Sequence, residues 1–331
     1  MVGQASLSAC NAQVDRLSKG NFQVKNRGLK EKTEKLAARI LTYLLKIIVK
    51  AIPEGMLYRF SHISGNLFFL LSEKRRNRTI RNLTFVYQNE KSSEEITRLA
   101  RRIFYEIAEA AVDTVVRLFK DVDLHQGLIE DISIEGAQYL DEALKTKKGL
   151  ICIGTHFGNF LFLALRLSLM GYPCNIVIKD SDHPVAAEIW HILMRGAGIQ
   201  WIPALPRIKA VSDSLKWLKK GGILFLYADQ KKRDGVEVKF FNHQVGTVEG
   251  PAILHLRTGA EILCAFMVKL ARRKHKIIIT PPIAVKKSGN REKDVSHLSQ
   301  AFTEIIETFV RQYPEQWWWP WRRKMKGNQR S

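Results

Sequence analysis

The sequence lacks several features that would place it in a familiar class of protein. It contains four cysteines among 331 residues, widely spaced and without a Cys-x-x-Cys pair. A disulfide framework is therefore not expected, and a reducing compartment fits this cysteine usage. Cys152 and Cys264 lie inside apolar runs, which favours simple packing in a core for both. The histidines have no spacing typical of a metal site, so we predict that no metal is bound.

A cleavable signal peptide and a clear membrane-spanning segment are also missing. Residues 1–30 are polar and basic and contain no apolar stretch. Residues 36–52 are apolar but include Arg39, Lys46 and Lys50, whereas a spanning helix needs ~20 apolar residues with few charges. We favour a helix that lies in the membrane interface, with its lysines reaching the headgroups. An amphipathic helix packed on a protein core is the alternative.

Acidic residues are scarce relative to basic ones. The chain has 53 Lys and Arg against 32 Asp and Glu, a formal net charge of +21. This excess predicts an anionic partner, which could be a lipid headgroup, a membrane surface, an acidic carrier protein or nucleic acid. Basic and aromatic residues together can follow a nucleic-acid strand, but no recognised motif accompanies them here. We therefore expect a membrane surface and no nucleic acid.

A helical pattern fills the first third of the chain, and strand–helix alternation fills the rest. Residues 31–72 are helical in pattern, residues 74–90 are basic and turn-like, and Ser92 with Glu95 forms a capping box that opens a long helix. From residue 149, short apolar runs alternate with helices, which predicts an α/β fold with a mixed, largely parallel sheet flanked by helices. We predict four regions: a basic flexible arm (1–30), a helical membrane-associated region (31–120), an α/β domain (121–325) and a tail (326–331).

A histidine follows one of the predicted strands. The run 149–154 reads as a buried strand, and His156 comes just before a helix predicted over 160–170. Ligands collect at the carboxyl ends of strands in open sheets, and a helix start offers free N–H groups. Gly158 would let a ligand approach the backbone, and Asn159 would cap the helix or donate a hydrogen bond. The turn places a base beside an anion-binding surface, as acyl transfer requires, although a structural histidine is the alternative.

Further segments follow in a fixed order. They are residues 154–160 (Gly-Thr-His-Phe-Gly-Asn-Phe), Asp229-Gln230, residues 235–241, Gly250-Pro251-Ala252, residues 257–260, residues 314–319 (Pro-Glu-Gln-Trp-Trp-Trp) and Arg322-Arg323. With these segments the chain resembles the late acyltransferases of lipid A biosynthesis and their relatives, among them the phosphatidylinositol mannoside acyltransferases, over most of residues 50–325.

The resemblance implies a glycerolipid acyltransferase-like fold, in which the α/β domain is catalytic and an N-terminal helical extension faces the membrane. It implies transfer of a fatty acyl group from acyl carrier protein or coenzyme A to a hydroxyl of a lipid A precursor or a lysophospholipid-like acceptor. No bound cofactor is implied. The expected location is the cytoplasmic face of the bacterial inner membrane, either peripheral or with one N-terminal anchor helix.

One position departs from the family pattern. The family carries Asp or Glu five residues after its catalytic histidine, and here that position is Leu161. Either another carboxylate orients the imidazole, or the protein is an inactive, membrane-binding relative. We favour Glu237 as the catalytic partner of His156, because the mannoside acyltransferases resemble this chain in carrying Glu there. Asp229, just beyond the strand predicted over 223–227, is the runner-up, and the family's Asp-Gln pair looks architectural.

Other residues are assigned to substrate binding. Arg195 resembles a family arginine that precedes a glycine, which implies contact with a substrate phosphate or the oxyanion; a surface arginine at a helix end is the alternative. Lys179 follows a predicted strand and is a candidate phosphate contact, and Gly158, Asn159 and Asp229 complete this set. The tryptophans of residues 317–321 lie beside a basic run, which favours membrane docking or packing over the acyl pocket.

Overall fold

The computed structural model describes residues 33–87, 90–179, 181, 183–229, 235–284 and 288–321. The chain divides into two compact units, one of residues 1–48 with 181–191 and one of residues 49–180 with 192–331. In the smaller unit, a helix that begins at residue 33 carries Arg39, which forms an ion pair of 3.8 Å with Glu188. The predicted arm over 1–30 and tail over 326–331 lie outside the described residues.

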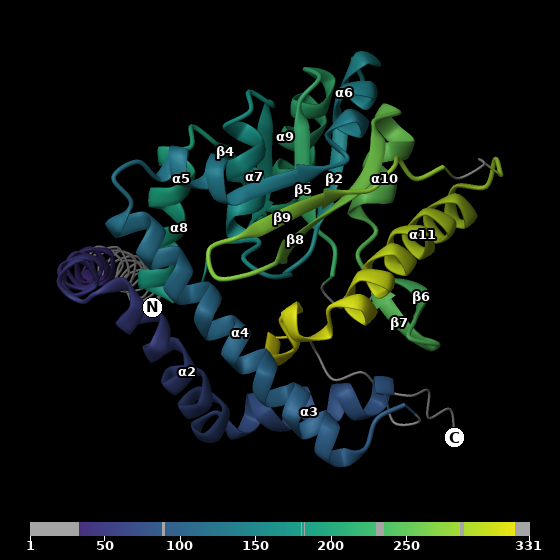
Figure 1. Cartoon of the computed structure of the whole chain (residues 1–331). Coiled ribbons are helices and arrows are strands. Elements are labelled where there is room, and N and C mark those ends of the chain that lie inside the picture. The colour runs from purple at the N-terminus through teal and green to yellow at the C-terminus, as the bar shows by residue number, and fades with distance from the viewer. Residues whose placement is uncertain are drawn as a thin grey trace, which may run out of the picture. The chain divides into compact units, whose positions relative to one another are not determined.

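The larger unit is built on a seven-stranded sheet with the order β1-β9-β8-β2-β5-β3-β4 (Figure 1). Neighbouring strands are parallel except β8 and β9, so that β9 and its parallel partner β1 run opposite to the rest. The prediction of a mixed, largely parallel sheet is confirmed. The strands are β1 (Ile132–Glu135), β2 (Leu150–Gly154), β3 (Cys174–Ile178), β4 (Gln200–Pro203), β5 (Ile223–Tyr227), β8 (Glu261–Lys269) and β9 (His275–Ile279).

Helices flank this sheet and share its core. Every residue of β2 is buried, as expected for a central strand covered on both faces. Ile151 and Ile153 of β2 belong to one hydrophobic cluster with side chains of α4, α9, α10 and α11. Cys152 and Cys264 are fully buried, so their predicted place in the core is confirmed. The helices around the sheet are α4 (Ser93–Lys120), α5 (Leu124–Asp131), α6 (Ala137–Lys145), α7 (Leu161–Ser168), α9 (Arg207–Lys219), α10 (Gly250–Thr258) and α11 (Arg291–Gln312). Helix α8 (Pro184–Gly196) begins in the smaller unit and ends in the larger one.

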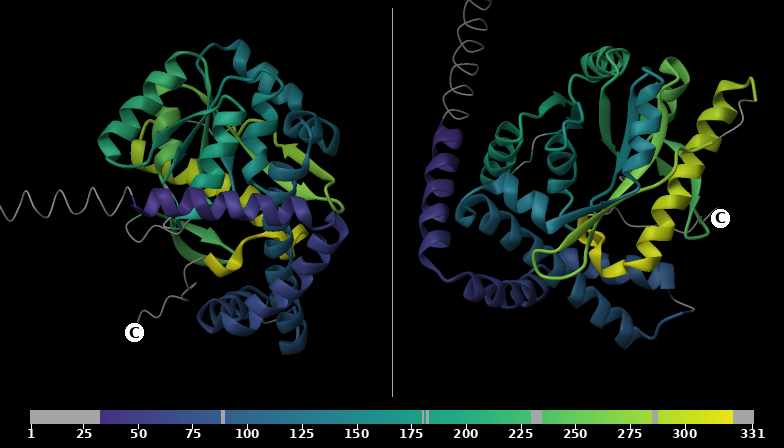
Figure 2. Two further views of the ribbon diagram at one scale, coloured as in Figure 1. Left: turned by 90° about the vertical axis from the view of Figure 1, so that its left-hand side faces the viewer. Right: turned by 45° about the horizontal axis from the view of Figure 1, so that its top comes forward.

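A separate hairpin of β6 (Val236–Phe240) and β7 (His243–Thr247) packs against α11 (Figure 2). The backbone N–H of Lys239 donates to the Gln300 side chain at 2.7 Å, and that of Phe241 donates to Glu307 at 2.5 Å.

The helices before the first strand include α2 (Glu54–Leu71), α3 (Glu73–Tyr87) and α4. The prediction of a turn-like stretch over 74–90 is wrong, because residues 73–87 are helical. Despite its many arginines, α3 buries Thr79, Leu83 and Val86, which are spaced by three and four residues. This narrow buried face is enough to hold the helix against the rest of the protein. The predicted capping box of α4 is confirmed, with Ser92 and Glu95 bonded in both directions. Within the described ranges, no helix combines the length and apolarity needed to cross a membrane.

Candidate active site

Two adjacent parallel strands bring a histidine and a carboxylate together. β2 and β5 pair in register from Leu150 and Ile223 to Gly154 and Tyr227. His156 lies two residues beyond the end of β2, and Asp229 lies two residues beyond the end of β5. The separation of 73 residues between them equals the offset of every β2–β5 pair. The two side chains therefore meet by continuing the register of the sheet past its carboxyl edge.

Asp229 holds His156 by two hydrogen bonds. The imidazole Nδ1 lies 2.9 Å from Oδ1 of Asp229, and the backbone N–H of His156 donates to Oδ2 at 2.9 Å. The Asp229 side chain is fully buried, whereas a fifth of the His156 side chain is exposed (21%). With Nδ1 donating to the carboxylate, Nε2 carries the free lone pair and is the basic atom of the ring. The ring packs against Phe160 and Tyr227, at centroid distances of 4.7 and 5.1 Å.

The tryptophan segment, residues 316–319, closes over this turn. Phe157 forms an antiparallel bridge with Trp317, and the backbone N–H of Trp318 donates to the His156 carbonyl at 3.1 Å. The indole N–H of Trp317 donates to Oδ2 of Asp229 at 2.9 Å, and that of Trp318 donates to the Gly158 carbonyl at 3.2 Å. Trp317 is buried and Trp318 half-buried, so this segment packs over the histidine turn.

The structure gives Gly158 a different role from the predicted contact with substrate. Its φ of +52° is in the left-handed region, and a Cβ there would lie 2.2 Å from the Met267 carbonyl oxygen of β8. Its N–H donates to the Gln316 carbonyl at 2.8 Å and is not available to a ligand. Glycine is required here because the turn passes close to a neighbouring strand.

The side chain of Asn159 anchors the turn to α4 and does not face a substrate, because it is buried (2% exposed). Its amide Nδ2 donates to the Ala110 carbonyl at 3.2 Å, to Asp113 Oδ2 at 3.2 Å and to Thr114 Oγ1 at 3.1 Å. Asp113 in turn accepts from Tyr58 and from Arg117, which is itself completely buried. The predicted side-chain contact of Asn159 with substrate is replaced by a buried hydrogen-bond network, whereas substrate binding by its backbone stays a prediction.

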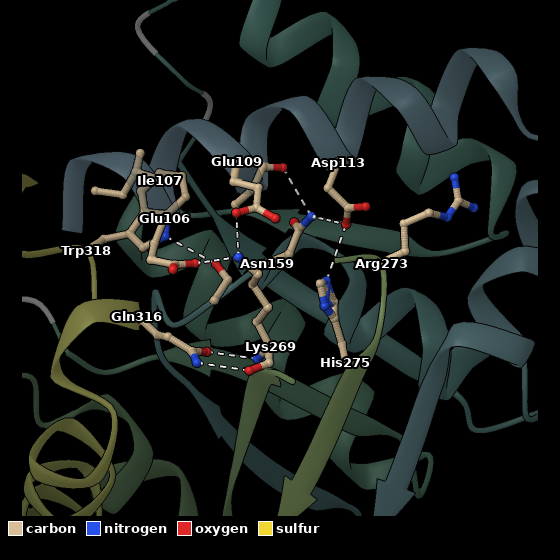
Figure 3. Close-up of a pocket in the computed structure, with 12 residues that line it drawn as sticks. Glu106, Ile107, Glu109, Asp113, Asn159, Lys269, Arg273, His275, Gln316 and Trp318 are labelled. Carbon is tan, nitrogen blue, oxygen red and sulfur yellow. Dashed lines mark hydrogen bonds and ion pairs between the residues drawn. The ribbon is translucent and has the colours of Figure 1, made fainter. Parts of the chain in front are cut away.

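A polar pocket lies behind the turn, where α4 faces the β8–β9 hairpin (Figure 3). Lys269 forms ion pairs with Glu106 and Glu109 at 2.7 and 2.6 Å, and His275 reaches Asp113 with Nε2 at 3.3 Å. Burial lowers the pKa of His275 to about 4, so its imidazole is neutral near pH 7. Within the described residues no group of His, Cys, Asp or Glu side chains forms a metal site.

The remaining predicted residues lie elsewhere. Glu237 is exposed on β6, and the contact predicted for it with the imidazole is made by Asp229 instead. Lys179 is exposed after β3, at the same edge of the sheet as His156 but beyond β5 in the strand order. Arg195 is exposed in the last turn of α8. Substrate binding by Lys179 and Arg195 stays a prediction.

Comparison with models of known protein families shows to which family the chain belongs. The model of the bacterial lipid A biosynthesis acyltransferases matches residues 30–325, nearly the whole chain. The chain belongs to the bacterial lipid A biosynthesis acyltransferase family. No curated protein matches it in a direct comparison.

Membership of the lipid A acyltransferase family assigns acyl transfer to this fold. In this member, the position at which the family is expected to carry its carboxylate is Leu161, the first residue of α7, which is partly buried. A carboxylate reaches the imidazole all the same, from the end of the neighbouring strand. The sequence does not predict the hydrogen bond from Trp317 to Asp229, since composition reveals an indole but not the acceptor of its N–H group.

Proposed function

We propose that this lipid A acyltransferase homologue moves a fatty acyl group from a carrier thioester to a hydroxyl of a membrane lipid or glycolipid. His156 is the general base, and Asp229 is the carboxylate that orients it. The observation that carries the proposal is the bond from Nδ1 to Asp229, which leaves Nε2 as the basic atom on a partly exposed ring.

The reaction follows from this arrangement. Nε2 takes the proton of the acceptor hydroxyl as its oxygen attacks the thioester carbonyl carbon. A new C–O bond forms and the carbonyl π electrons move onto oxygen. The C–S bond then breaks, and the imidazolium returns the proton to the departing thiolate. Asp229 stabilises the imidazolium between these two steps.

Donors for the tetrahedral oxyanion are available where α7 begins. The backbone N–H groups of Asn159, Phe160 and Leu161 donate to no other described residue, and they follow directly after the histidine turn. Unpaired N–H groups at a helix start favour negative charge, so this turn suits the developing oxyanion. The Gly158 N–H is not among these donors, because it bonds to the Gln316 carbonyl.

The alternative of an inactive relative rests on Leu161. Because Asp229 supplies a buried carboxylate to His156, the absence of a carboxylate at position 161 is not a reason to expect a loss of catalytic activity.

The acyl donor can be acyl carrier protein or coenzyme A, since both are acidic and suit a chain of net charge +21.

A membrane surface is the proposed partner of α2. Met56, Phe60, Ile63, Leu67 and Leu70 recur at spacings of three and four residues, and each is more than half exposed. The following helix α3 begins with Lys74, Arg75, Arg76 and Arg78, which suit anionic headgroups. An apolar stripe beside basic residues is typical of a helix that lies in the membrane interface. We propose peripheral binding at the cytoplasmic face of the inner membrane.

One experiment tests the chemistry. Purified protein is incubated with radiolabelled acyl carrier protein or coenzyme A thioester and a panel of lipid A precursors and lysolipids. We expect acyl transfer to at least one acceptor and its loss in His156→Ala. Equal turnover by wild type and His156→Ala, or no turnover with any pair, would contradict the proposal.

A second experiment tests the membrane surface. Phe60→Ser with Ile63→Ser should reduce sedimentation with vesicles containing anionic phospholipid. The control is Ile208→Ser, which removes an apolar side chain that is 88% exposed on α9. Equal sedimentation of both variants and wild type would exclude the α2 stripe.

A further inference from the structure

Trp317 contacts the catalytic carboxylate at the oxygen that does not face Nδ1 of the imidazole. Its indole N–H donates to Oδ2 of Asp229 at 2.9 Å, an oxygen that also accepts the His156 backbone N–H, whereas Nδ1 of His156 lies 2.9 Å from Oδ1. Trp317 is 2% exposed and the Asp229 side chain is fully buried. A buried carboxylate depends on such donors, because it has no water to replace them.

We propose that Trp317 is a positioning residue of the acyl transfer and acts through Asp229. Together with the His156 backbone N–H on the same oxygen, its indole N–H fixes the plane of the carboxylate, so that Oδ1 faces Nδ1 of His156, and it shares the negative charge. This inference rests on the proposed function, in which His156 is the base.

The backbone around Trp317 is held by the same turn that it supports. Phe157 bridges to Trp317, the Gly158 N–H donates to the Gln316 carbonyl at 2.8 Å, and the Trp318 N–H donates to the His156 carbonyl. Gln316 is itself bonded to the β8 backbone at Lys269 in both directions, at 2.8 and 3.0 Å (Figure 3). These contacts fix the indole relative to His156. Among the large aromatic side chains of Phe, Tyr and Trp, only that of tryptophan carries an N–H group.

The indole also has an electrostatic effect on the pair. A donor on Oδ2 stabilises the charged carboxylate and draws charge away from the oxygen that faces the imidazole. Removing the donor leaves more charge on Oδ1, which favours the imidazolium. His156 should then hold its proton up to a higher pH, and the neutral form that acts as base should appear later in a titration.

The experiment compares Trp317→Phe with Trp319→Phe in the full-length chain. Trp319 is also buried in the tryptophan segment, but its indole donates to the Pro314 carbonyl at 2.8 Å and not to Asp229. We expect Trp317→Phe to raise the pH at which kcat/KM falls on the acid side by about one unit. This shift corresponds to the free energy of one hydrogen bond to a charged group. We also expect kcat to fall about tenfold with KM values nearly unchanged. Trp319→Phe should leave the acid limb in place.

A second readout does not depend on turnover. The His156 imidazole is titrated by NMR with labelled histidine in wild type, Trp317→Phe, and both chains carrying Asp229→Asn. The upward shift caused by Trp317→Phe should vanish in the Asp229→Asn background, because the indole acts through that carboxylate. If Trp317→Phe does not fold, benzothienylalanine at position 317 keeps the ring shape without the N–H group.

The possible results distinguish the positioning role of Trp317 from the proposed acyl-transfer function. Titration curves and acid limbs that are the same in wild type and the folded Trp317 variants would overturn this inference, whatever the activity. Persistence of the shift in the Asp229→Asn background would also overturn it. Full turnover by His156→Ala would instead contradict the proposed function, and the NMR titration would still report on the indole.

Discussion

Nδ1 of His156 lies 2.9 Å from Oδ1 of Asp229, a residue 73 positions later in the chain. The family is expected to supply its carboxylate five residues after the histidine, on the same turn. Here the carboxylate comes from the next strand of the sheet, in register with the histidine. The two solutions place a negative charge beside the same imidazole by different routes, one local and one through strand pairing.

The first prediction separates the two candidate carboxylates. Asp229→Asn should lower kcat by about 10²- to 10⁴-fold, because an amide cannot hold the Nδ1–H tautomer or stabilise the imidazolium. Glu237→Gln, at an exposed position of β6, should stay within about threefold of wild type, as surface changes away from the reacting groups usually do. Steady-state transfer assays measure both. A large loss in Glu237→Gln with a small loss in Asp229→Asn would reverse the assignment.

The second prediction concerns the close approach of the turn to β8. Gly158→Ala places a Cβ against the Met267 carbonyl oxygen and adds the strain of a positive φ, so the melting temperature should fall. Gly171→Ala is the control, since its φ is +89° but no atom lies within 4 Å of the added Cβ. Differential scanning calorimetry should show a clearly larger fall for Gly158→Ala. Equal falls would mean that the contact with β8 relaxes without cost.

The third prediction tests the buried network behind the turn. Arg117 is fully buried and pairs with Asp113 and Asp131 at 3.1 Å, so Arg117→Met leaves carboxylates without their cation. The free energy of unfolding should fall by about 3–5 kcal/mol in denaturant titrations. Arg311→Met, at a partly exposed pair with Glu90, should cost less than about 1 kcal/mol. A small effect at Arg117 would show that Tyr58 and Asn159 satisfy Asp113 without it.

The fourth prediction concerns acid stability. The unfolded chain binds a proton at His275 near pH 6.5, whereas burial lowers the pKa in the folded protein to about 4, so protons favour unfolding between these values. This group should reduce the free energy of unfolding by roughly 3 kcal/mol as the pH falls from 6.5 to 4. His275→Gln should flatten the pH dependence of stability in that window. His62→Gln, which removes an exposed histidine, is the control; the same slope in all three proteins would contradict the assignment.

The sequence predicts the strands and the histidine turn well, because these features are local. The apolar runs that become β2 and β5, and the residues that follow them, are visible in the chain itself. What is not visible is that β2 and β5 are neighbours, and this pairing alone decides between Asp229 and Glu237. Strand order depends on the packing of the whole domain, so residues at two strand ends cannot be matched from sequence spacing.

Two other misreadings have equally physical causes. The helix α3 is rich in arginine, and its narrow buried face of Thr79, Leu83 and Val86 is hidden among charges. The expectation for Asn159 came from its place before a helix, where a side chain often caps the N-terminus. The structure turns that side chain toward Asp113 on α4, an element far away in the chain, and no local pattern indicates it.

The tryptophan segment has a consequence for how the protein is made. The strands that carry His156 and Asp229 leave the ribosome well before Gln316, Trp317 and Trp318, and these late residues supply hydrogen bonds to the turn and to the carboxylate. A nascent chain can build the sheet early, but the turn gains its full set of bonds only when translation has passed residue 318. Completion of the site is thereby linked in time to synthesis of the tryptophan segment.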